Sequence, residues 1–131
     1  MPVQSISKGV RMSSRKVGVV ASLVRGHSVA DALTILSHTP RRSAEPVKKA
    51  IESARANAEH NHNYKPDTLQ ITLISVTNGP SLKRSRPASH GRALPFQRRS
   101  SHIRVIVDGE QRVAKKPAPK TETNSVSKET K

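Results

Sequence analysis

The first strong periodic pattern of apolar positions along the chain lies in residues 13–26. Its apolar face is formed by Val17, Val20, Ala21 and Val24. Ser13 or Ser14 is a suitable N-cap, and Gly26 supplies a C-terminal stop. The spacing therefore predicts an amphipathic helix over these residues.

A second helical pattern follows after a tight turn, over residues 28–40. Ser28 and Asp31 have the spacing of a capping box, with Asp in place of the usual Glu or Gln. Pro40 ends the pattern, because proline cannot continue a helix. The predicted apolar stripe of this helix consists of Val29, Ala32, Leu33 and Leu36.

The third helical pattern is the longest and covers residues 43–61. Its narrow apolar face, suited to close packing, consists of Ala44, Val47, Ile51, Ala54 and Ala58. Pro46 is tolerated only in the first turn, where its missing N–H would be unpaired. We therefore expect this helix to start at or after Ser43, with Ser43 as its N-cap.

The apolar pattern then changes to that of strands. Residues 68–77 place Leu69, Ile71 and Leu73 on one face, whereas Ile74 and Val76 take the other. This switch indicates a bulge or a strand buried on both faces. Residues 102–107 form a second clear strand, with Ile103, Val105 and Val107 on one side. Residues 3–11 are a weaker strand candidate, because Val3, Ile6 and Val10 do not alternate strictly.

The connection between the two clear strands, GPSLKRSRPASHGRALPFQRRSSH, is basic and contains no acid. A solvated loop is the simplest interpretation, but a structureless connection this long is usually functional or disordered. Because strands flank it on both sides, we favour a two-stranded arm with Gly91 in the turn and prolines at its free edges. An isolated two-stranded ribbon is marginally stable in water, so packed nucleic acid would supply the missing burial.

The composition of the chain indicates the chemical class of its partner. The chain has 131 residues, 24 Lys and Arg against 9 Asp and Glu, a formal net charge of +15 and a pI of about 11.4. Such a surplus favours a polyanion, with nucleic acid first and a membrane surface second. No basic helix with a Trp or Phe face supports the membrane, and no apolar run approaches the about 20 residues of a spanning helix.

The aromatic residues are only Tyr64 and Phe96, which argues for recognition of nucleic-acid backbone and shape over base-by-base reading. Cysteine is absent, so disulfides, thiolate metal sites and cysteine nucleophiles are excluded together. The histidines considered as metal ligands or as acid/base groups are His60, His62, His90 and His102. His60 and His62 do not share a helical face and no carboxylate cluster joins them, so no metal, cofactor or catalytic residue is expected.

Several motifs, in order and spacing, resemble the bacterial large-subunit ribosomal protein twenty-two family. They are SSRKVGVVASLVRG, ESARANAEHN, NGPSLKRSRP, HGRA and RRSSHIRVIV, and the resemblance covers about residues 3–110. It implies an α+β fold in which three helices pack on a small three-stranded antiparallel sheet, with a long protruding β-hairpin at residues 79–101. It also implies that the weak first strand belongs to the sheet and that the basic N-terminus is not a transit peptide.

The same resemblance implies a structural, non-enzymatic protein of the large ribosomal subunit in the cytoplasm. Its partners would be large-subunit ribosomal RNA, neighbouring ribosomal proteins and the nascent polypeptide, because the family's hairpin lines the exit tunnel. The implied hairpin tip is Pro87, Ala88, Ser89, His90, Gly91 and Arg92. The hairpin tips of family members usually carry basic residues where this chain has Ala88 and His90, and often where it has Pro95.

We predict phosphate contacts from basic residues of both the body and the arm. The body residues are Arg11, Arg15, Lys16 and Arg25, and the arm residues are Lys83, Arg84, Arg86, Arg92, Arg98 and Arg99. Residues 1–110 are expected to form one RNA-binding domain, and residues 111–131, rich in Lys, Pro, Ser and Thr, a disordered basic tail. The alternatives are a DNA architectural protein with basic arms and a small basic ribonuclease.

Overall fold

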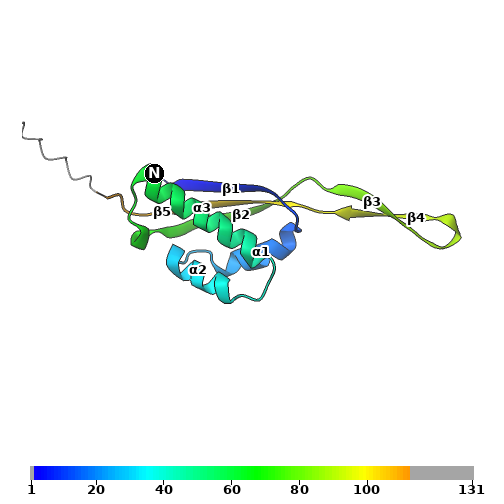
Figure 1. The fold of residues 1–131 in the computed structure, drawn as a ribbon, viewed down its shortest axis with the longest axis horizontal. Helices are drawn as coiled ribbons and strands as arrows, with labels where there is room; N and C mark the ends of the chain where they lie inside the picture. Colours follow the sequence, from blue (N-terminus) through cyan, green and yellow to red (C-terminus); the bar gives the residue numbers. More distant parts are fainter. Residues whose placement is uncertain (1, 113–131) are drawn as a thin grey trace, which may run out of the picture.

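The computed structural model describes residues 2–112, and Figure 1 shows a compact body from which a long two-stranded arm projects. The helices are α1 (Ser14–Leu23), α2 (Val29–His38) and α3 (Ala44–His62). The strands are β1 (Val3–Val10), β2 (Gln70–Asn78), β3 (Leu82–Pro87), β4 (Ala93–Arg98) and β5 (Ser101–Asp108). Two short 3-10 turns, η1 (Pro66–Thr68) and η2 (Ser89–Gly91), complete the described elements.

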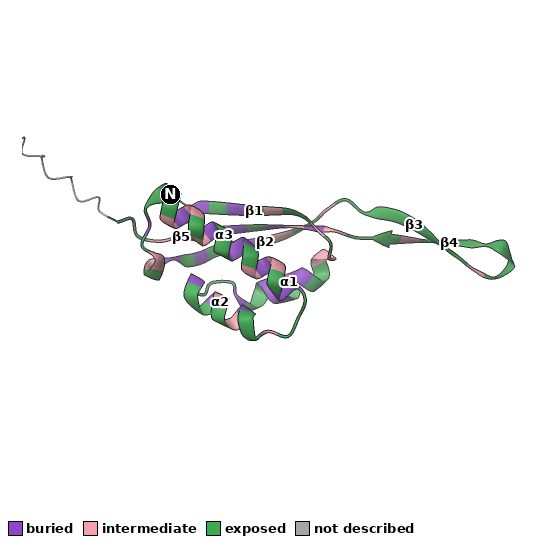
Figure 2. Ribbon diagram, in the orientation of Figure 1, coloured by how far each residue is buried: buried purple, intermediate pink, exposed green. Residues whose placement is uncertain are grey.

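The body is a three-stranded antiparallel sheet in the order β1-β5-β2, with helices packed against it. In β5 the alternate residues Ile103, Val105 and Val107 are fully buried, as their spacing predicted. They meet the apolar face of α3, where Val47, Ile51, Ala54 and Ala58 are equally buried. This single core holds the helices and the sheet together, and Figure 2 shows that burial is concentrated in the body.

The α+β class, the three helices and the antiparallel pairing agree with the prediction. The expectation of one three-stranded sheet needs correction, because the five strands form two sheets. The second sheet consists of β3 and β4, which pair antiparallel without a break in register. Leu82 pairs with Arg98 at one end of this sheet, and Pro87 pairs with Ala93 at the other. We call these paired strands and their turn, residues 82–98, the arm.

The helix boundaries follow the predicted caps with two differences. The predicted capping box of α2 is present in part: Ser28 Oγ accepts a hydrogen bond from the Asp31 N–H. The Asp31 carboxylate accepts its bond from the Ser28 hydroxyl, whereas in a full box it would accept from the Ser28 N–H. α3 begins at Ala44, so Pro46 lies in its first turn as expected. Ser43, however, caps α3 only by position, because its side chain makes no capping hydrogen bond. α1 ends at Leu23, three residues before Gly26, which has a φ of +80° in the turn to α2.

The irregular strand patterns have local causes. In β2 the pairing with β5 shifts between Ile71 and Leu73, so the predicted bulge is present. As a result Ile71 and Ile74 are buried and Leu73 is 42% exposed, which corrects its assignment to the face of Ile71. In β1 the register shifts between Ser7 and Val10, so Val10 packs against the core although it is an odd number of residues from the buried Val3. Ile6 lies in the regular part of the strand, on the other face from Val3, and is 49% exposed.

The last two described residues, which follow the predicted domain boundary at residue 110, contact the two residues that follow α3. Gln111 forms an isolated antiparallel β-bridge with Tyr64. The N–H of Arg112 donates a hydrogen bond to the carbonyl oxygen of Asn63 at 2.7 Å. The rest of the predicted tail, residues 113–131, lies outside the described residues. Within residues 2–112, none of the helices has the length and apolarity needed to cross a membrane.

Candidate nucleic-acid interface

A basic groove of about 970 Å³ lies where the arm joins the body. Its cationic lining residues are Arg11, Lys16, Arg41, Arg42, Arg98 and Arg99. None of the Asp and Glu residues in the described part of the chain lines it, and it is framed on the arm side by Pro80, Leu82, Gln97 and Ser100. A concentration of one sign of charge in a concave surface strengthens the local potential and attracts a polyanion.

Three different segments of the body supply the cations of this groove. Arg11 follows the end of β1, Lys16 lies in the first turn of α1, and Arg41 and Arg42 precede α3. The antiparallel ends of β1 and β5 bring the first segment beside Arg98 and Arg99, because Val10 pairs with Ser101. The fold thus collects residues that are up to 88 positions apart, from Arg11 to Arg99, at one place.

The N-termini of α1 and α3 also open onto the groove. Their N-cap residues, Ser13 and Ser43, both line it, and neither side chain accepts a hydrogen bond from its helix. A helix N-terminus carries a partial positive charge and N–H groups without helical partners, which favour an anion. The two helix ends therefore add to the charge of the arginine and lysine side chains.

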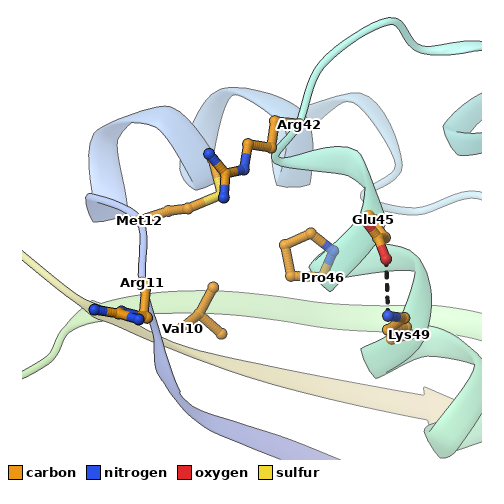
Figure 3. A pocket seen from close by; sticks show the side chains of 7 residues that line it. All are labelled: Val10, Arg11, Met12, Arg42, Glu45, Pro46 and Lys49. Atoms are coloured by element: carbon orange, nitrogen blue, oxygen red, sulfur yellow. Dashed lines mark hydrogen bonds and ion pairs between the residues drawn. The ribbon is translucent and has the colours of Figure 1, made fainter.

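A smaller pocket of about 240 Å³ adjoins the groove, shares Arg11, Met12 and Arg42 with it, and is also lined by an acid, Glu45. Figure 3 shows that Glu45 points to Lys49, with which it forms an ion pair of 2.8 Å, while Arg42 extends towards Met12. The hydrogen bond and charge of Lys49 lower the pKa of Glu45, and Arg42 contributes less. Glu45 is therefore an ionised partner of Lys49, and the guanidinium of Arg42 has no ion pair within the described chain.

The cations of the arm are exposed along its whole length. Lys83, Arg84, Arg86, Arg92 and Arg98 all lie on the surface, and Figure 2 shows the arm almost entirely exposed. The ion pairs of residues 2–112 involve Lys49, Arg55 and Lys65, so none of the predicted contact residues is neutralised by an acid. Two of the arm guanidiniums have local contacts: Arg84 donates to the carbonyl of Lys83 at 2.7 Å, and Arg86 lies over the Phe96 ring.

The structure brings together some of the predicted contact residues and separates others. Arg11, Lys16, Arg98 and Arg99 meet in the groove, whereas Lys83, Arg84, Arg86 and Arg92 lie farther out on the arm. Arg15 is exposed on α1 but does not line the groove. Arg25 donates to the carbonyl oxygen of Ile74 at 3.2 Å, so this side chain also links the turn after α1 to β2.

Arg41 and Arg42 were missed by the sequence reasoning. They stand next to each other in the short segment between Pro40 and the N-cap of α3, which was read only as a helix boundary. An adjacent pair of arginines directly before a helix N-terminus was the available signal, since both features attract anions.

The predicted tip forms a tight turn between the two arm strands. The N–H of Ala88 donates to the carbonyl oxygen of Arg92 at 2.7 Å, and His90 and Gly91 both have positive φ values, 57° and 67°. Arg92 is the only Arg or Lys in the turn between Pro87 and Ala93. The turn therefore presents little charge compared with the strands.

The histidines do not converge on a site. His102 Nδ1 accepts a hydrogen bond from the Gly9 N–H at 3.0 Å, while His60 and His62 lie at the end of α3 and His90 lies in the arm turn. In residues 2–112 no group of three or more His, Cys, Asp or Glu side chains has the arrangement of a metal site.

Comparison with known proteins decides between the alternatives. Residues 5–108 match the family described as ribosomal protein L22p/L17e. The chain belongs to this family. Proteins named large ribosomal subunit protein uL22 are similar to it over most of their length. That of Desulfitobacterium hafniense strain Y51 is 48% identical over 104 residues, which are 79% of this chain and 91% of the relative.

Two further relatives extend the match. The uL22 proteins of Clostridium perfringens strain 13 and Desulforamulus reducens are each 46% identical over 107 residues. These cover 82% of this chain and 96% and 95% of the respective relatives. The chain is therefore a structural ribosomal protein of the bacterial large subunit, located in the cytoplasmic ribosome, and it is not an enzyme. The ribonuclease alternative is thereby removed.

Proposed function

We propose that this protein binds large-subunit ribosomal RNA through the basic groove and the arm together, and that the arm lines the nascent-peptide exit tunnel. The observation that carries the proposal is the groove, where six cations from the body and the arm have no ion pair and no lining acid among residues 2–112. A polyanion is the partner that compensates such an arrangement.

Binding operates by displacement of counterions from phosphates. Each phosphate that a Lys or Arg neutralises releases condensed cations, so affinity falls with rising salt in proportion to the number of contacts. Contacts of this kind set position and orientation without reading sequence. Because the base of the arm lines the groove, the two form one continuous basic surface that fixes the arm relative to the RNA bound in the groove.

The dimensions of the arm suit a probe that reaches through RNA. Each of its strands has six residues, and at about 3.3 Å per residue the paired part extends roughly 20 Å beyond the sheet. A two-stranded ribbon of this kind is only marginally stable alone, so RNA packed around it supplies the missing contacts. We infer that this arm is the family hairpin, and that its turn, residues 87–92, faces the nascent polypeptide.

The proposed organisation is one RNA-binding domain, residues 1–110, whose arm belongs to the hairpin region 79–101. Neighbouring large-subunit proteins are its further partners through body surfaces that RNA leaves free. Residues 111–131 are proposed as a basic tail, rich in Lys, Pro, Ser and Thr.

The proposal is tested by measuring dissociation constants of the full chain for transcribed large-subunit ribosomal RNA and for duplex DNA at matched salt. We expect tighter binding of the RNA, and retention on large ribosomal subunits after a high-salt wash. Equal or tighter binding of duplex DNA, the partner of architectural proteins with basic arms, would contradict the proposal that the groove and the arm bind large-subunit RNA.

A further inference from the structure

The unbroken register of the arm divides its side chains between two faces. Residues opposite each other in an antiparallel pair project to the same side, and successive pairs alternate. One face, which we call the arginine face, carries the pairs Leu82–Arg98, Arg84–Phe96 and Arg86–Leu94. The other, which we call the small face, carries Lys83–Gln97, Ser85–Pro95 and Pro87–Ala93.

A side-chain contact supports this division. The guanidinium carbon of Arg86 lies 5.1 Å from the centre of the Phe96 ring. Arg86 is paired with Leu94, so Phe96 is its diagonal neighbour, and diagonal neighbours touch only when they share a face. The contact is an attractive cation–π interaction, which fixes the ring and the guanidinium plane on this side of the arm.

The two faces have different chemistry. Every pair of the arginine face joins one arginine to one large apolar residue, and Leu82 and Leu94 are 51% and 58% exposed. The small face has a single cation, Lys83, among small or uncharged residues. The exposed leucines keep apolar area in contact with water, and the three arginines on the same face repel one another, so a partner that covers the face and carries negative charge would relieve both.

RNA is the partner that compensates both features of the arginine face. Its phosphates neutralise guanidinium groups, and its unstacked bases and riboses offer apolar surfaces on which aromatic rings and guanidinium planes stack. The same face also continues into the basic groove, since its first pair, Leu82 and Arg98, lines that groove. Gln97 of the small face also lines the groove, but its pair partner Lys83 does not, so Lys83 still represents the small face.

We propose that the arm contacts ribosomal RNA through its arginine face and leaves the small face free of RNA. The inference rests on the proposed function and adds to it which side of the arm is covered. It also assigns a role in RNA contact to Leu82, Leu94 and Phe96, three apolar residues that a count of charges overlooks.

Adjacent residues provide a matched test of the charged contacts. Arg84→Gln and Lys83→Gln remove the same charge from neighbouring positions of β3 on opposite faces. With the full chain and transcribed large-subunit ribosomal RNA, dissociation constants are measured over a series of KCl concentrations. Arg84→Gln should weaken binding several-fold and reduce the salt slope by about 0.7–0.9, the value for one phosphate contact. Lys83→Gln should change the slope by less than half as much.

A second adjacent pair tests the apolar contacts. Leu94→Ser and Ala93→Ser alter neighbouring residues of β4, again on opposite faces. Leu94→Ser should weaken binding several-fold without a change of salt slope, because no charge is removed. Ala93→Ser should bind as the unchanged chain does. Both positions are exposed, and circular dichroism checks that each variant is folded.

Equal losses for Arg84→Gln and Lys83→Gln would overturn the inference, because RNA would then surround the arm. An unchanged dissociation constant for Leu94→Ser would overturn it as well, because RNA would then not cover the apolar residues of the arginine face. Arg84→Lys keeps the charge and should restore most of the slope. If the unchanged chain does not prefer large-subunit RNA over duplex DNA, the proposed function fails and this inference with it. If it does and the two faces respond alike, only this inference fails.

Discussion

The N–H of Gly79 donates to the carbonyl oxygen of Ser100 over 2.9 Å, at the point where the sheet ends and the arm begins. The hydroxyl of Ser100 in turn donates to the carbonyl oxygen of Pro80 at 2.6 Å. A Cβ on residue 79 would lie 2.5 Å from Ser100 Oγ and 3.2 Å from its carbonyl carbon. The junction between body and arm is therefore built around the missing side chain of Gly79.

Replacing Gly79 by Ala should destabilise the chain by about 1–2 kcal/mol, because the new methyl group displaces Ser100 Oγ and breaks its hydrogen bond. The measurement is urea unfolding. Gly18→Ala is the matched control: Gly18 lies inside α1 with nothing within 4 Å of a Cβ, so Ala should stabilise by up to about 1 kcal/mol. A Gly79→Ala variant as stable as the unchanged chain would show that the junction can absorb a side chain.

The cap of α2 should contribute more to stability than that of α1. Ser28 Oγ accepts a hydrogen bond from the Asp31 N–H at 3.1 Å, whereas Ser13 makes no side-chain cap bond with α1. Ser28→Ala should therefore cost about 1 kcal/mol and Ser13→Ala clearly less. Thermal unfolding of the two variants at equal concentration checks the order. Equal losses would mean that the hydroxyl of Ser28 adds nothing beyond its position.

The Glu45–Lys49 pair gives a prediction for pH. Its hydrogen bond lowers the pKa of Glu45 from the ordinary 4.5 and raises the pKa of Lys49 from the ordinary 10.5. Because the folded pKa of Glu45 is the lower one, its contribution to stability is complete above 4.5 and is lost as pH falls through the folded value. Because the folded pKa of Lys49 is the higher one, its contribution is complete below 10.5 and is lost as pH rises through the folded value.

Nuclear magnetic resonance titration of the Glu45 carboxyl carbon should show this lowered pKa, and Lys49→Met should raise it back towards 4.5. The same substitution leaves two opposing causes in place, burial, which raises the pKa, and the smaller effect of the Arg42 charge, which lowers it, so no net lowering should remain. An unchanged Glu45 pKa in Lys49→Met would assign the shift to a different neighbour.

The body should fold without the arm. The buried residues of the sheet, among them Ile71, Ile103 and Val105, lie outside residues 83–99, and the strands of the arm pair only with each other. Replacing residues 83–99 by a short turn should change the free energy of unfolding by less than about 1 kcal/mol, within the range of surface changes. It should also flatten the salt dependence of RNA binding. Loss of the folded state would make the arm part of the core.

Much of the body could be predicted because its elements follow local rules. The capping spacing of Ser28 and Asp31 fixed the start of α2, and the restriction on Pro46 fixed the start of α3. The alternation of Ile103, Val105 and Val107 identified the central strand. In each case the signal lies within a few residues of the feature it predicts.

The features that were missed depend on contacts between distant segments. Leu73 was placed on the wrong face because the bulge position is set by pairing with β5, which periodicity alone does not show. Arg41 and Arg42 could be assigned to the interface only from the fold, in which they line the same groove as Arg98 and Arg99. The number of charged residues in the sequence predicted that the chain is basic. The location of the groove depends on the pairing of β1 with β5, which brings distant basic residues together.

The groove arginines provide the last prediction. Arg41→Gln and Arg42→Gln should each weaken binding to large-subunit ribosomal RNA and lower the salt slope, by up to about 0.9 where the side chain contacts a duplex phosphate. Arg55→Gln is the control: it removes the same charge, but Arg55 is already neutralised by Glu59 at 2.7 Å and does not line the groove. It should leave the slope unchanged. All three residues are outside the core, so unfolding curves should stay close to that of the unchanged chain.

If Arg55→Gln lowers the slope as much as the other two, binding responds to net charge alone, and the groove has no special part in it. If only the groove variants respond, the segment before α3 is an RNA-contact element that acts together with the base of the arm.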